Sequence, residues 1–218
     1  MKRALLLYGG WKGHRPAQMA DFAAEHLLGG FETIRSRALD SLNPETLSEF
    51  DLLLPIWTFG RLTRKQETAL LEAVAGGMGM MALHGNASSF LDSRPHKFML
   101  GGQFVGHPGG NHITYTVKFL GNDPLVSGLE DVTITSEQYY LLIDPAVKVL
   151  ATTAVDGGDM EWLRGVQMPV AWKRTWGKGR VFYCALGHTV DVLANPTITE
   201  LLKRAVRWAS RGSSQTDN

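Results

Sequence analysis

The chain has one cysteine, almost no excess of charge of either sign and no long apolar run. Its single cysteine, Cys184, excludes an intramolecular disulfide framework and favours a reducing compartment. The formal net charge is +1 and the basic residues are scattered, so a nucleic acid is not expected as a partner. No apolar run approaches the roughly 20 residues of a membrane span. We therefore expect a cytoplasmic protein that binds neither nucleic acid nor membrane.

The chain does have the composition of a folded domain with a core, because 44% of its residues are hydrophobic and 20% are charged. Its first half alternates strand-like and helix-like segments. Apolar runs predict strands buried on both faces, at residues 3–9, 51–57 and 78–83, and an alternating strand at 31–37. Intervening segments predict helices at 15–30, 43–50 and 63–77, the last with a Thr63/Gln66 capping box.

Strands and helices in alternation predict βαβ units and a parallel sheet. The second half is rich in strands, at 112–119, 147–153, 166–174 and 180–187, and a final helix begins at Asn195 and Pro196. We expect one α/β domain over residues 1–210, with a mostly parallel central sheet, helices on both faces and a β-rich second half. The polar residues 211–218 are expected to form a disordered tail.

The stretch "MMALHGNASSF" at residues 80–90 indicates the functional edge of this sheet. Ligands of open parallel sheets bind beyond the carboxyl ends of the strands, and His84 directly follows a predicted strand. Many α/β enzymes carry a Ser or Cys nucleophile at such a corner. A neutral imidazole there can act as a base, donate a hydrogen bond or bind a metal, or it can simply cap the turn.

Four further titratable residues occupy loops or strand ends. His14 and His107 lie in the glycine-rich segments "GGWKGH" and "GHPGG", where the backbone can approach a ligand, although His107 can equally fix a turn. Glu137 follows the strand-like "DVTIT" and precedes two tyrosines, so partial burial can raise its pKa. His188 ends the late strand "CALGH". Glu137 and His188 also have ordinary interpretations, as an edge-strand carboxylate and a surface histidine.

Several polar and aromatic side chains fall in or beside the same loops and are candidate contacts for a ligand. Aromatic rings can stack on the apolar face of a ligand, and polar side chains can bind its hydroxyls. On this basis Trp11, Trp57 and Tyr139 are assigned to substrate binding, together with His14 and His107. A list of polar candidates completes the set: Asn86 in the 80–90 corner, and Arg174, which can bind a hydroxyl or a carboxylate.

Several motifs occur in an order that resembles the trehalose-utilisation (ThuA-like) family. They are "GGWKGH", "ALHGNASSF", "LGGQFVGHPGG", "SEQYY" and "PVAWKRTWGKGRVFYCALGH". The resemblance implies a flavodoxin-like fold similar to class I glutamine amidotransferases, and a dimer. In that fold the catalytic histidine occupies the place of His188, which would then face His84. The family usually shows Asp-Glu-Leu-Tyr where this chain has Ser136-Glu137-Gln138-Tyr139.

The resemblance implies carbohydrate metabolism, with a sugar or a 3-keto-sugar as substrate. His84, Glu137 and His188 are the candidate catalytic residues, for isomerisation, elimination or hydrolysis. The same three residues are the candidate ligands of a divalent metal, and no nucleotide cofactor is expected. Cys184 lies inside an apolar run, so cysteine-dependent amidotransferase chemistry is not expected. The alternative is a non-catalytic sugar-binding or regulatory module.

Overall fold

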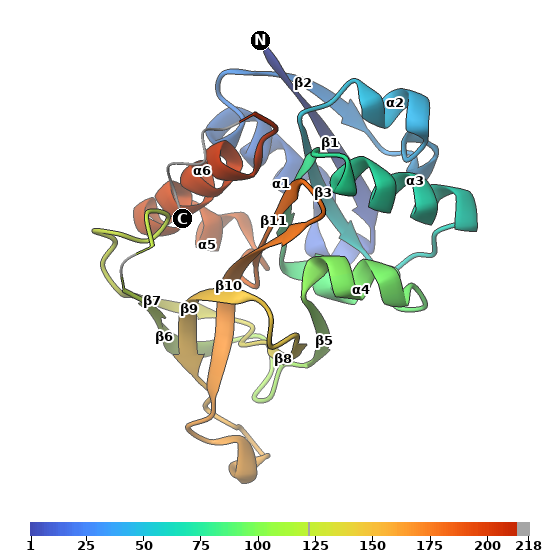
Figure 1. Cartoon of the computed structure of the whole chain (residues 1–218). Coiled ribbons are helices and arrows are strands. Elements are labelled where there is room, and N and C mark those ends of the chain that lie inside the picture. Colours follow the sequence, from blue (N-terminus) through green and yellow to red (C-terminus); the bar gives the residue numbers. More distant parts are fainter. Residues whose placement is uncertain (122, 213–218) are drawn as a thin grey trace.

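Parallel and antiparallel strands share one nine-stranded sheet, with the order β2-β1-β3-β4-β11-β10-β9-β6-β7 (Figure 1). The computed structural model describes residues 1–121 and 123–212. The strands of this sheet are β1 (Lys2–Gly10), β2 (Phe31–Ser36), β3 (Leu52–Thr58), β4 (Gly79–Leu83), β6 (Ile113–Phe119), β7 (Val132–Ser136), β9 (Lys148–Ala154), β10 (Gln167–Trp176) and β11 (Gly179–Cys184). A small second sheet pairs β5 (Gly102–Gly106) with β8 (Tyr140–Ile143).

The first half of the chain forms the predicted βαβ arrangement. The helices are α1 (Pro16–Phe22), α2 (Pro44–Ser48), α3 (Arg64–Ala75), α4 (Arg94–Leu100), α5 (Val190–Leu193) and α6 (Pro196–Ala209), and α1 continues as a π-helical turn over Ala23–Leu27. Both hydrogen bonds of the Thr63/Gln66 capping box are present at the start of α3. The side chain of Asn195 caps α6 as predicted.

The prediction of a mostly parallel sheet is wrong, because the sheet is mixed. β2, β1, β3, β4 and β11 run parallel, whereas β11, β10, β9, β6 and β7 pair antiparallel. The physical reason lies in the connections. The two-residue turn Gly177-Lys178 joins β10 to β11, and a tight turn can join only antiparallel strands. In the described part of the chain, no α-helix that could serve as a parallel crossover lies between β6 and β11.

Helices cover both faces of the parallel half, as expected (Figure 1). On one face, α1 contacts β1 and β3, α6 contacts β4 and β11, and α5 packs against both helices. On the opposite face, α3 and α4 contact β11. The antiparallel half extends beyond these layers and ends in the β9–β10 hairpin. Of the tail predicted to be disordered, Arg211 donates its backbone N–H to the carbonyl of Asp51, and residues 213–218 lie outside the described residues.

Candidate active site

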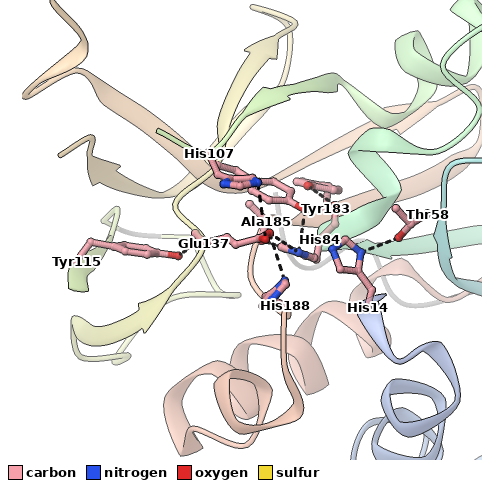
Figure 2. A network of polar contacts seen from close by, with 10 residues as sticks. His14, Thr58, His84, His107, Tyr115, Glu137, Tyr183, Ala185 and His188 are labelled. Atoms are coloured by element: carbon pink, nitrogen blue, oxygen red, sulfur yellow. Dashed lines mark hydrogen bonds and ion pairs between the residues drawn. The ribbon is translucent and has the colours of Figure 1, made fainter. Parts of the chain in front are cut away.

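Histidines gather at the carboxyl ends of the parallel strands (Figure 2). His14 follows β1, His84 follows β4 and His188 follows β11, so three loops bring them to one edge. Glu137 arrives from the antiparallel half, directly after β7, and points into the same space. The site therefore lies where the two halves of the sheet meet, and each half contributes to it.

Backbone hydrogen bonds determine which nitrogen of His84 carries the proton. Its Nδ1 lies 2.8 Å from the carbonyl oxygen of Ala185. A carbonyl only accepts, so Nδ1 is the N–H and the lone pair of Nε2 faces the site. Burial raises the pKa of Tyr139 well above its usual value, and its hydroxyl therefore remains protonated and donates to Nε2 at 2.8 Å. Burial also lowers the pKa of His84, which favours the neutral ring.

The corner that holds His84 is conformationally constrained. His84 has a φ of 36°, in the left-handed region that residues other than glycine rarely adopt, and this strain is typical of functional sites. The hydroxyl of Tyr183 donates to the His84 carbonyl oxygen at 2.8 Å. The side-chain amide of Asn86 donates to the carbonyl oxygen of Pro55 at 2.7 Å. These contacts tie the corner to β3 and β11.

Glu137 is the centre of the cluster. Its Oε2 lies 3.2 Å from Nε2 of His84 and 3.3 Å from Nδ1 of His188. Its Oε1 lies 3.8 Å from Nε2 of His107. Burial acts to raise the pKa of Glu137, but the contact with His188 outweighs burial and holds the pKa well below its usual range. The carboxyl group is therefore ionised at neutral pH.

His14 adds a second neutral imidazole. Its Nδ1 lies 2.8 Å from Oγ1 of Thr58, and its ring centroid is 4.7 Å from that of His84. Burial, followed by the proximity of His84, lowers the pKa of His14 to about 3. Gly85 permits this approach, because a Cβ at that position would lie 2.0 Å from Thr58 Oγ1 and 2.8 Å from His14 Nδ1.

The cluster has the donor set and spacing of a metal site. Potential ligand atoms of His14, His84, Glu137 and His188, one from each, all lie within 4.8 Å of one another. Ligands about 2.0–2.1 Å from a tetrahedral zinc ion are about 3.3–3.4 Å apart. The distances from Glu137 Oε2 to the nitrogens of His84 and His188 match this separation. The neutral imidazoles of His14 and His84 beside an ionised carboxylate also favour a cation.

The structure distributes the remaining predicted residues over three environments. Tyr139 and His107 lie in the cluster, and Trp11 lies beside it with its ring centroid 4.7 Å from that of His14. Trp57 packs against Gly9 and Gly60. Arg174 lies away from the cluster, where it pairs with Asp144 at 2.6 Å and donates to the carbonyl oxygen of Phe98.

Cysteine-dependent chemistry is disfavoured at this edge of the sheet. Cys184 is fully buried at the end of β11, and burial raises its pKa to about 12, so the thiolate is strongly disfavoured. The corner typical of a nucleophile instead holds His84.

Sequence reasoning missed three partners of the histidines. Thr58 ends β3 at the same sheet edge, and this polar residue after an apolar run was a usable signal. Tyr183 sits within an apolar strand, so its hydrogen bond to His84 had no local signal. The carbonyl of Ala185 had none either, since every residue carries one.

Fold and site together define a single-domain α/β protein with a His/Glu cluster at the edge of a mixed sheet. The family model described as trehalose utilisation (ThuA) matches residues 3–209, and the chain belongs to this family. A comparison with curated proteins found no match. No helix in the described part of the chain is long and apolar enough to cross a membrane.

Solved structures with little sequence identity share the fold. A ThuA-like protein from Bacteroides uniformis is 20% identical, with a TM-score of 0.78 over 95% of this chain and 91% of its own. Another, from Parabacteroides merdae, is 16% identical, with a TM-score of 0.79 over 100% and 92%. A β-galactosidase from Rahnella sp. R3 is 13% identical, with a TM-score of 0.66, and the match covers 97% of this chain but 32% of that enzyme.

Proposed function

We propose that the protein is a carbohydrate enzyme that moves a proton at the carbon beside the ketone of a keto-sugar, with a divalent metal ion held by His84, Glu137 and His188. The family, described by trehalose utilisation, supports a carbohydrate as substrate. The observation that carries the proposal is the position of Glu137 Oε2, which lies 3.2 Å and 3.3 Å from two histidine nitrogens.

The protonation of His84 makes a cation at this point favourable. Its Nδ1 proton is committed to the Ala185 carbonyl, so Nε2 and the Glu137 carboxylate are two acceptors 3.2 Å apart. An ion bound between them would replace the Tyr139 hydroxyl as the partner of Nε2. His14 can serve as a fourth ligand, and histidine-rich sites suit zinc and other late first-row metals. When bound, such an ion polarises a carbonyl oxygen and acidifies the adjacent C–H.

His107 is the residue best placed to carry the proton. Its side chain is 34% exposed, whereas that of Glu137 is 6% exposed, so His107 can exchange protons with solvent. It contacts Oε1 of Glu137, the oxygen that does not face His84 and His188. We assign His107 as the base, with the Glu137 carboxylate beside its Nε2.

An exposed aromatic pair next to the cluster supports a sugar as the substrate. Trp11 and Phe59 are 47% and 49% exposed, and their ring centroids lie 6.1 Å apart. Trp11 also contacts His14. The apolar face of a sugar ring can stack on this pair while its carbonyl lies over the cluster.

Deuterium exchange tests the chemistry. Methyl 3-keto-α-glucopyranoside in D₂O with Zn²⁺ or Mn²⁺ should lose the proton NMR signal at C2 or C4 faster with protein than without it. His107→Gln should lower the protein-dependent rate at least about 100-fold while leaving bound metal unchanged. The matched control is His26→Gln, on an exposed histidine outside the cluster. Sugar binding by the wild type without exchange on any keto-sugar would contradict the enzyme and favour a binding module.

A further inference from the structure

A polar cavity adjoins the cluster on the side of His188. Its volume is about 540 Å³, within the range of small-molecule sites. The polar residues of the lining include Arg15, Asn111, His112, His188, Asp191 and Asn195. His188 belongs both to this cavity and to the cluster, where its Nδ1 contacts Glu137. A molecule in the cavity would therefore lie against a residue of the cluster.

The polar groups of this cavity are not engaged with one another. Within residues 1–121 and 123–212, the side chains of Arg15, Asn111, His112 and Asp191 make no hydrogen bond or ion pair with another residue. Asn195 accepts backbone N–H groups through Oδ1 to cap α6, which leaves its side-chain NH₂ as a donor. The cavity thus presents both donors and acceptors without partners.

The charge of the lining identifies the class of ligand. The positive charge of the Arg15 guanidinium balances the negative charge of the Asp191 carboxylate. Asp191 would repel an anion such as phosphate, and Arg15 would repel a cation. Neutral molecules with many hydroxyls suit this set, because hydroxyls donate to Asp191 and accept from Arg15 and the amides. Arg15 follows His14 with a φ of 45°, so a strained backbone connects the cluster to the cavity.

We propose that this cavity is a second binding site, which holds the non-reacting, hydroxyl-rich unit of a neutral glycoside, and that Arg15 and Asp191 determine specificity for it. This inference rests on the proposed function for the position of the reacting unit, but binding in the cavity is a separate property. The substrate then has two units. One stacks at Trp11 and Phe59, over the cluster, and the other lies beyond His188.

Calorimetric titration with trehalose, which has no ketone, tests the cavity independently of turnover. Wild-type protein should bind trehalose at least about tenfold more tightly than glucose, and Arg15→Gln or Asp191→Asn should weaken trehalose binding about tenfold. The matched controls are Arg35→Gln and Asp21→Asn, which alter an exposed ion pair elsewhere and should leave affinity unchanged.

Each outcome separates the two proposals. Trehalose binding that depends on Arg15 and Asp191, without exchange of any keto-sugar, would support the cavity and contradict the proposed chemistry. Equal affinity for glucose and trehalose, unchanged affinity in both cavity variants, or no trehalose binding by the folded wild type would overturn the second site. Thermal unfolding of each variant establishes that it is folded.

Discussion

Single contacts decide the chemical state of the histidines. The Ala185 carbonyl fixes the tautomer of His84, and burial keeps both His84 and His14 neutral beside an ionised Glu137. A different acceptor arrangement around the same residues would leave the wrong nitrogen facing the site. The identity of the residues is therefore insufficient, and their hydrogen-bond partners give them a function.

His96, a buried histidine away from the cluster, makes stability depend on pH. Burial and then the proximity of Lys97 lower its pKa to about 3, whereas an unfolded histidine titrates near 6.5. The unfolded chain thus binds one more proton between these values, and stability present above pH 6.5 is lost as pH falls toward 3. The contribution to the slope is about 1.4 kcal/mol per pH unit.

Denaturant unfolding at several pH values checks this contribution. Between pH 6 and 4, the free energy of unfolding should fall more steeply with decreasing pH for wild type than for His96→Leu. The two slopes should differ by about 1.4 kcal/mol per pH unit. The variant His26→Leu should keep the wild-type slope, because His26 is exposed. Equal slopes for wild type and His96→Leu would show that His96 is not held neutral in the fold.

At the scale of elements, strand ends predicted most of the cluster. His14, His84 and His188 each follow an apolar run, and the rule for parallel strands places such residues at one edge. That rule could not show that the predicted substrate-binding residue Arg174 lies away from the site. It lies on β10, paired with Val181, three residues from the Ala171–Cys184 pair at the site end of the strand. Only the register reveals that distance.

Other elements were missed for local reasons. α4 contains a proline at its second residue and spans seven residues, so its apolar period is too short to recognise. β5 begins and ends with glycine, and β8 has four residues. The sequence also could not predict which tryptophans are exposed. Trp11 is exposed, whereas Trp57 packs against Gly9 and Gly60, and only the tertiary structure brings these residues together.

A buried ion pair connects β10 to the segment between β6 and β7. Asp123 lies 2.7 Å from the ammonium of Lys173 on β10 and 2.8 Å from that of Lys148 on β9. Burial acts to raise the pKa of Asp123, but the two ammonium groups outweigh it and hold the pKa below its usual value. The stabilisation is therefore present above about pH 4 and is lost as pH falls through the lower, folded value.

Asp123→Asn should lower the free energy of unfolding at pH 7 by about 3 kcal/mol, because it leaves the buried Lys173 ammonium without a carboxylate. The loss should shrink at pH 3, below the pKa of an unfolded aspartate, because the unfolded wild-type chain then binds a proton that the folded carboxylate disfavours. Asp21→Asn, in an exposed pair, should cost less than about 1 kcal/mol. Denaturant unfolding at both pH values measures these differences, and an equal cost for the two variants would refute the buried-pair interpretation.

At the scale of the whole molecule, the mixed sheet explains why the site is composite. The parallel half supplies His14, His84 and His188 through the geometry of its strand ends. Glu137, Tyr139 and His107 come from segments connected with the antiparallel half. Prediction from the sequence identified these residues but not their arrangement, because the pairing of the second half depends on turns and register. Both halves are needed to place four ligand atoms within 4.8 Å.

The most direct test of this account is the metal content of protein loaded with Zn²⁺ or Mn²⁺ and freed of excess, measured by elemental mass spectrometry. Wild type should retain about one ion per chain, His84→Ala should lose it, and Tyr139→Phe and the exposed-site control His26→Ala should keep it. Wild type that retains no ion from either metal, or His84→Ala that retains as much as wild type, would contradict a metal centre at His84, Glu137 and His188.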